Sequence, residues 1–158
     1  MNPWKYTETP TDEIRLHFST GSGFGGAFVR GWTRSRFAHV SITTPGFTVD
    51  AAPGRGVGYR DEAVGESIAL PITVTQGLTL AEFVHHELGS PYDWMGDVAA
   101  GLPWAARAHD TAWFCSEFGA ACLQSIGYLP RSIEPWRLSP QALHDLLTAL
   151  TFKDRIHG

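Results

Sequence analysis

The chain has 158 residues, enough for one domain with a sizeable core and too few for two, so residues 1–158 are expected to form a single domain. Hydrophobic residues make up 43% and charged residues 18%, which excludes a disordered tail and a membrane bundle. The formal net charge is −4 without a long basic run, which argues against a nucleic-acid partner because phosphate binding needs clustered Lys and Arg.

No export signal is expected at the beginning of the chain. Residues 1–11 lack the basic start and apolar stretch of a secretory signal, and no segment reaches transmembrane length. A cytoplasmic protein is therefore the expectation, and a phage-associated or lysis-released role is compatible with it. The oligomeric state is left open.

The first half of the chain is predicted to form a meandering antiparallel sheet. Ile14, Leu16 and Phe18 alternate with polar residues, a period of two that is typical of a half-buried strand. A turn at Pro45-Gly46 separates two further apolar runs. Strands are predicted over residues 14–18, 39–44, 47–52, 56–60 and 67–73.

The second half is predicted to be helical. Thr79 with Glu82 fits a capping box, and Gly89 is placed to end that helix. A second helix is predicted over residues 115–126, and a third from Ser139-Pro140 to Leu150. Strands followed by helices predict an α+β fold.

Cys115 is the candidate nucleophile because it stands at the opening of the second predicted helix. The partial positive charge of a helix N-terminus stabilises a thiolate, and the same N–H groups can receive an oxyanion. A small buried side chain is the alternative interpretation of a free cysteine. Cys122 lies seven residues further along the same helix, ~10 Å away by helical rise, so a disulfide between the two is excluded and Cys122 is interpreted as core.

His39 is the candidate base among the seven histidines. It begins an apolar strand, FAHVSI, where the strand would hold the imidazole rigidly; a hydrogen-bonded core histidine is the alternative. His85 and His86 precede Glu87 as in a zinc HExxH motif, but Ser90 replaces the second histidine. These two histidines are therefore expected on a solvated helix face, and no metal site is predicted.

Asp50 is the candidate acceptor that orients the imidazole. If the hairpin turns between Pro45 and Gly46, residues whose numbers add to about 91 pair, so His39 lies opposite Ala52, two places from Asp50. A shift of register by one residue would change which face Asp50 occupies, and another polar residue could then take the third role.

Gly21, Gly23 and Gly26 satisfy the GxGxxG pattern of a dinucleotide site. A hairpin follows at once, whereas a Rossmann domain continues with parallel crossovers. These glycines are therefore interpreted as a loop near the site, and no cofactor is expected.

Two segments resemble the core of the NlpC/P60 thiol hydrolases: GSPYDW at residues 89–94 and WFCSEFGAACLQSIGYLPR at residues 113–131. Matching positions, in order, are Tyr92, Trp94, Cys115, Ser116, Gly127, Leu129, Pro130 and Arg131. Ordinary members carry their histidine after the cysteine, whereas here it precedes the cysteine. The chain is in this respect similar to the circularly permuted branch, the YiiX/YebB-like and poxvirus-type group, which includes relatives of lecithin:retinol acyltransferase. Glu117 departs from the glycine usual in the family.

The resemblance implies a papain-like, circularly permuted α+β fold with a Cys-His-Asp triad of Cys115, His39 and Asp50. It also implies that Tyr92 and Trp94 line the substrate pocket. The expected activity is hydrolysis of an amide (in a peptide, an isopeptide or a cell-wall stem peptide) or of an ester through an acyl-enzyme. A peptide or a lipid-linked acyl group is the expected partner. A lipid acyltransferase or thioesterase-like enzyme, or a non-catalytic binding module on the same fold, remains the alternative, although retention of all three polar positions argues against loss of activity.

Overall fold

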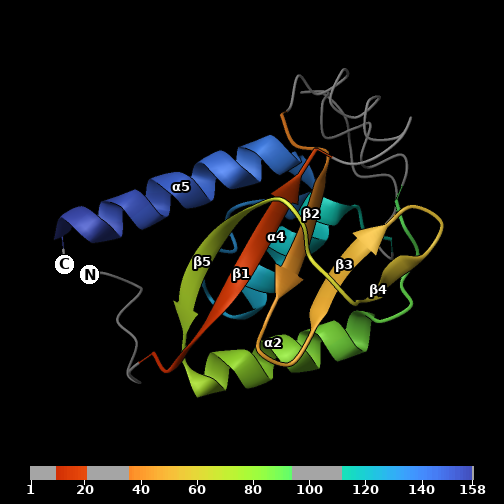
Figure 1. Cartoon of the computed structure of the whole chain (residues 1–158), viewed down its shortest axis with the longest axis horizontal. Coiled ribbons are helices and arrows are strands. Elements are labelled where there is room, and N and C mark those ends of the chain that lie inside the picture. Colours follow the sequence, from red (N-terminus) through yellow and green to blue (C-terminus); the bar gives the residue numbers. More distant parts are fainter. Residues whose placement is uncertain (1–9, 21–35, 94–111, 158) are drawn as a thin grey trace.

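Within the residues that the structure describes, the sheet has five antiparallel strands; Figure 1 shows their arrangement. A computed structural model describes residues 10–20, 36–93 and 112–157, with side chains described as far as Lys153. The strands are β1 (Asp12–Ser19), β2 (His39–Thr43), β3 (Thr48–Ala52), β4 (Gly56–Arg60) and β5 (Glu66–Ile72). Their order is β4-β3-β2-β1-β5. The motif of Gly21, Gly23 and Gly26 lies outside the described residues.

The predicted meander is correct for β2, β3 and β4 but wrong for β5, which crosses to the opposite edge and pairs with β1. Gly65 leads into β5 with a φ of 113°, a conformation that L side chains rarely adopt. A Cβ added at Gly65 would lie 2.1 Å from the carbonyl oxygen of Phe18. The chain can therefore enter this edge position only because residue 65 has no side chain.

Helices follow the sheet, as an α+β fold requires. They are α2 (Val74–Glu87), α4 (Cys115–Ser125), the short 3-10 helix η1 (Pro135–Arg137) and α5 (Pro140–His157). Figure 1 shows α4 behind the sheet, with α2 and α5 along opposite sides of it. In the part of the chain that the structure describes, no helix is long and apolar enough to cross a membrane.

Helix α2 begins six residues earlier than the sequence predicted. The capping box is formed by Thr73, whose side chain accepts from the N–H of Gln76 at 3.2 Å, while the Gln76 side chain accepts from the N–H of Thr73 at 3.0 Å. Gln76 also donates to the carbonyl of Ile126 at the end of α4, at 2.9 Å. This tertiary contact favours the earlier start over the Thr79 cap, whereas Gly89, with a φ of 84°, follows the helix end as predicted.

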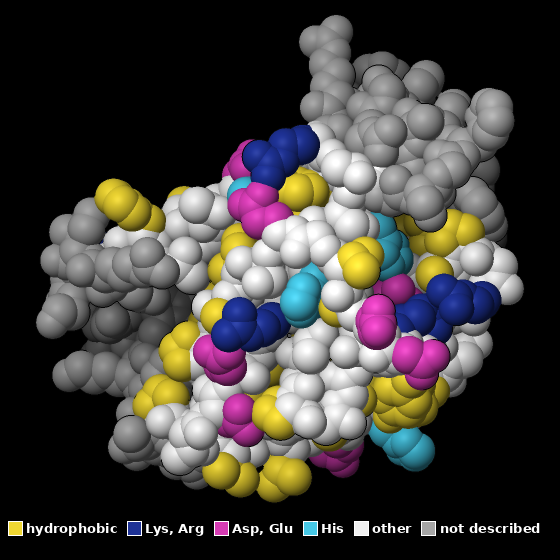
Figure 2. All heavy atoms as spheres, in the orientation of Figure 1, with side chains coloured by type: hydrophobic (Ala, Val, Ile, Leu, Met, Phe, Trp, Pro, Cys, Tyr) yellow, Lys and Arg dark blue, Asp and Glu magenta, His cyan; other side chains and the backbone are white. Residues whose placement is uncertain are grey.

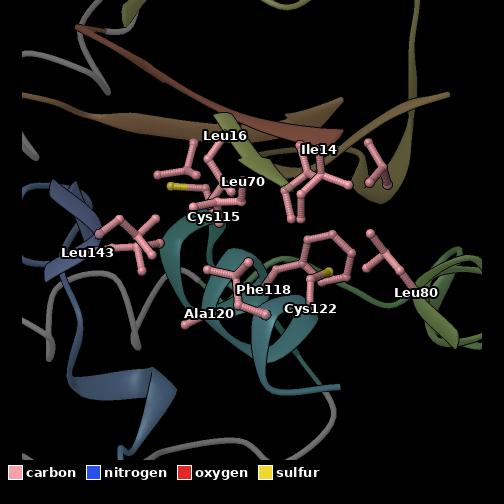
Figure 3. Close-up of a cluster of buried hydrophobic side chains, with 14 of the residues drawn as sticks. Ile14, Leu16, Leu70, Leu80, Cys115, Phe118, Ala120, Cys122 and Leu143 are labelled. Atoms are coloured by element: carbon pink, nitrogen blue, oxygen red, sulfur yellow. The ribbon is translucent and has the colours of Figure 1, made fainter. Parts of the chain in front are cut away.

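The hydrophobic core lies between α4 and one face of the sheet. Figure 3 shows Phe118 and Cys122 of α4 facing Ile14 and Leu16 of β1 and Leu70 of β5. Every residue of α4 from Cys115 to Leu123 is buried. Burying one large apolar side chain contributes ~1.5–3 kcal/mol, so this contact fixes where α4 sits on the sheet.

The close approach of α4 to the strands depends on Gly119. A Cβ at Gly119 would lie 3.3 Å from Cγ1 of Val40 and 3.5 Å from a methyl group of Leu143. Helix α5, which supplies Leu143, begins as predicted: Ser139 accepts from the N–H of Ala142 at 3.2 Å. It extends beyond the predicted end at Leu150.

Candidate active site

Strands β2 and β3 pair only over part of their length. The paired residues are Ile42 with Val49 and Thr43 with Thr48, which is the register that the sequence predicted. Toward His39 the two strands diverge, and the first turn of α4 lies behind the place where they separate (Figure 1). Side chains from both strands and from α4 can therefore meet there.

His39 and Asp50 lie in contact across this divergence. Nε2 of His39 is 2.7 Å from Oδ2 of Asp50. Val40 and Ile42 face the core, so the alternation along β2 assigns His39 to the other face, and the register assigns Asp50 to that same face. The Asp50 side chain is 6% exposed and that of His39 is 26% exposed. The carboxylate is thus buried behind a ring that reaches solvent.

Cys115 is the first residue of α4, as predicted. Its thiol donates to the carbonyl oxygen of Ala38, the residue before His39, over an Sγ–O distance of 3.8 Å. Phe114, the residue before the helix, is extended and makes no side-chain capping bond. The N–H groups of the first turn have no intrahelical partner, so they are positioned to stabilise negative charge near the thiol.

The pKa of His39 depends on both Asp50 and Cys115. Burial lowers the pKa of His39, but hydrogen bonds to the Asp50 carboxylate and to the Cys115 side chain raise it, and so do the charges of these two groups. The balance raises the pKa of His39 to about 10. This pKa favours the protonated imidazole at neutral pH, and the ring contacts the Asp50 carboxylate at the end of β2.

Arg60 belongs to this group and was missed in the sequence. Its Nη2 forms an ion pair with Oδ1 of Asp50, although the two atoms are not aligned as a hydrogen bond. Strand β4 pairs Gly58 with Asp50 and Arg60 with Thr48, so Arg60 lies diagonally beside Asp50 on the same face. Extending the hairpin register to the next strand could have identified it. Charged and histidine side chains gather over β3 and β4 in Figure 2.

Tyr92 is brought near the helix that carries Cys115, but through the backbone. It forms an isolated parallel bridge with Trp113, two residues before Cys115. The indole of Trp113 donates to the Glu87 carboxylate at 2.7 Å, which holds this segment against the end of α2. Tyr92 is half-buried. Trp94, the other residue expected in the pocket, lies outside the described residues.

The two histidines of α2 do not form a metal centre with neighbouring side chains in the described residues. His85 and His86 are both exposed, as expected of a solvated helix face, and His86 contacts Glu87 at 2.9 Å. Across residues 10–20, 36–93 and 112–153, no group of three or more His, Cys, Asp or Glu side chains is placed to hold a metal ion.

Cys122 faces the core, as the sequence predicted. Its side chain is fully buried, next to Phe118 and Ile14 (Figure 3). Burial raises the pKa of the Cys122 thiol well above its ordinary value, and the charge of Glu87 adds to this. The two cysteines of one helix thus have different surroundings, and only Cys115 lies next to an imidazole.

Two comparisons with known proteins were made, one with protein-family models and one with curated proteins. No protein-family model matches the chain, and a search of curated proteins returns no match.

Proposed function

We propose that this protein is a cysteine hydrolase that cleaves an amide or ester bond through an acyl-enzyme, with Cys115 as nucleophile, His39 as base and Asp50 as the residue that orients His39. One arrangement carries the proposal: the His39 imidazole contacts a buried carboxylate, and the thiol at the first residue of a helix contacts the carbonyl of Ala38, the residue before His39. A nucleophile, a base and an orienting acceptor within reach of one another form the arrangement that covalent acyl transfer needs.

The chemistry follows from the protonation of His39. The raised pKa of His39 favours transfer of the thiol proton to the imidazole, which leaves Sγ as the attacking atom. Sγ adds to the substrate carbonyl carbon, and the negative oxygen is received by the N–H groups at the start of α4. His39 then gives its proton to the leaving nitrogen or oxygen, whose bond to carbon breaks, leaving a thioester on Cys115.

The second half returns the enzyme to its starting state. His39, now neutral, takes a proton from water as the water oxygen attacks the thioester carbonyl. The carbon–sulfur bond breaks, the acid is released, and the proton on His39 again neighbours the thiolate. Asp50 accepts from the ring throughout and holds its orientation, without itself taking up the proton.

A papain-like fold of the circularly permuted NlpC/P60 type is part of this proposal. It is supported by the order of the groups along the chain, with the histidine strand before the cysteine helix, and by the packing of that helix on an antiparallel sheet. Tyr92 is proposed to line the pocket because it is anchored two residues before Cys115. A peptide amide or a lipid-linked ester is the proposed substrate class.

The decisive experiment is a panel of amide, ester and thioester substrates, followed by intact-mass detection of a covalent acyl adduct. Wild-type protein is expected to accumulate an adduct that maps to Cys115, and Cys115→Ala is expected to lose both adduct and turnover. Cys122→Ala is the matched control and should retain both. Turnover that survives in Cys115→Ala would refute the proposal, whereas an adduct without release of product to water would indicate the transferase alternative. A folded wild type that forms no adduct with any class would indicate the binding-module alternative.

A further inference from the structure

The two carboxylate oxygens of Asp50 have different partners. Oδ2 contacts Nε2 of His39 at 2.7 Å, whereas Oδ1 forms an ion pair with Nη2 of Arg60. The Asp50 side chain is 6% exposed and the Arg60 side chain 13% exposed, so both charges are largely removed from water. A buried ion is costly unless a counter-charge is close, so the Arg60 guanidinium stabilises the Asp50 carboxylate at this position.

Arg60 is itself held in place. Its Nη1 donates to the carbonyl oxygen of Tyr59 at 2.7 Å. The residue that faces Asp50 on β4 is Gly58, and a Cβ there would lie 3.3 Å from Nη1 of Arg60. The absence of a side chain at Gly58 lets the guanidinium lie across β4 and reach the carboxylate. The ion pair therefore depends on the strand pairing and not only on a flexible side chain.

We propose that Arg60 is a positioning residue: it holds the Asp50 carboxylate so that Oδ2 is presented to His39, and its positive charge moderates the pull of that carboxylate on the imidazole proton. This inference rests on the proposed function. The two effects have separate consequences. Loss of orientation slows the steps in which His39 transfers a proton, and loss of the counter-charge makes His39 hold its proton more tightly.

The test compares Arg60→Met with Arg60→Lys, and with Arg55→Met as the matched control, because Arg55 is an exposed arginine on the same hairpin. Arg60→Met is expected to lower kcat roughly 10- to 100-fold with little change in KM, as expected for misplacement of a catalytic group. The alkaline limb of the pH–kcat profile should move to higher pH. Arg60→Lys keeps the positive charge, so it should return the alkaline limb toward its wild-type pH more fully than it restores kcat.

A double-mutant cycle with Asp50→Asn decides whether Arg60 acts through Asp50. In the Asp50→Asn background, Arg60→Met should add little further loss, because the carboxylate that it positions is gone. Equal losses in both backgrounds, or an unchanged pH limb in folded Arg60→Met, would overturn the inference. Circular dichroism checks folding. The pH profile of Cys115 alkylation measures the alkaline limb, which reports the titration of His39, without a substrate. If His39→Ala leaves that alkylation profile unchanged, the proposed function itself fails; if only Arg60→Met leaves it unchanged, the inference about Arg60 alone fails.

Discussion

Nε2 of His39 lies 2.7 Å from Oδ2 of Asp50, although the two residues are not directly opposite one another in the hairpin. The register places Asp50 two positions from the residue that faces His39, which makes them diagonal neighbours on one face. The divergence of β2 and β3 increases the space between the strands at this end. Two side chains of moderate length bridge it, and the Cys115 thiol lies beside the same strand end.

Replacement of His39 by Ala is expected to abolish turnover and to slow alkylation of Cys115 by iodoacetamide at mildly acidic pH. The reason is that the imidazolium stabilises the thiolate that reacts. Rates of alkylation across a pH series, read by mass spectrometry, provide the measurement. Should the variant keep both its alkylation profile and its turnover, another histidine is the base, and His109, which lies outside the described residues, is the first replacement to test.

Asp50→Asn is expected to lower activity less than His39→Ala does, because orientation of the ring is secondary to the presence of the ring. The amide can still contact Nε2, but it no longer supplies a negative charge to the imidazolium. Steady-state kinetics of the two variants side by side give the comparison. A loss in Asp50→Asn that equals or exceeds that of His39→Ala would contradict this ranking.

Cys122 is expected to resist thiol reagents in the folded protein and to react only after unfolding, because it is fully buried and burial raises the pKa of its thiol. Titration with a chromogenic disulfide reagent before and after denaturation counts the accessible thiols. Cys115→Ala leaves Cys122 as the single cysteine and is the sharpest form of the experiment. Rapid labelling of that folded variant would show the prediction to be wrong.

Stability should decrease as pH rises through the titration of His39. The pKa of His39 is about 10 in the folded protein and 6.5 in its ordinary state, so the folded state binds the proton more tightly. The stabilisation is complete below about pH 6.5 and is lost between there and about pH 10. Urea unfolding of wild type and His39→Gln at several pH values across this window measures it. The difference between the two should shrink with rising pH; a constant or growing difference contradicts the assignment.

Gly65→Ala is expected to destabilise the protein by several kcal/mol, since the residue has a positive φ and an added Cβ would clash with the backbone of Phe18. Gly46→Ala in the β2–β3 turn is the matched control, because a Cβ there meets nothing within 4 Å. Thermal unfolding of both variants gives the comparison. Similar melting temperatures for the two would argue against the close approach of residue 65 to β1.

Features that depend on local chemistry could be predicted from the sequence. The Pro45-Gly46 turn sets the register that brings Asp50 to His39, and Gly127 follows the end of the Cys115 helix as expected. Features that depend on distant contacts could not. The return of β5 to the edge beside β1 rests on the backbone contact at Gly65.

The start of α2 and the role of Arg60 show the same limit. Thr73 and Thr79 both fit a capping pattern, and the choice between them involves a bond from Gln76 to the carbonyl of Ile126, which is far along the chain. Arg60 looks like an ordinary strand residue until the pairing of β3 with β4 is known. Its ion pair with Asp50 is a property of three adjacent strands and not of any one segment.

The thiol of Cys115 contacts the carbonyl of Ala38 across 77 positions of sequence. During synthesis, β2 and β3 leave the ribosome well before the helix that carries the cysteine, so the proposed base and its acceptor are made before the proposed nucleophile. The imidazole can reach the thiol only after α4 has packed on the sheet. A chain released early, before residue 115, therefore lacks the proposed nucleophile, and under the proposed function the order of segments delays reactivity until synthesis has passed the core helix.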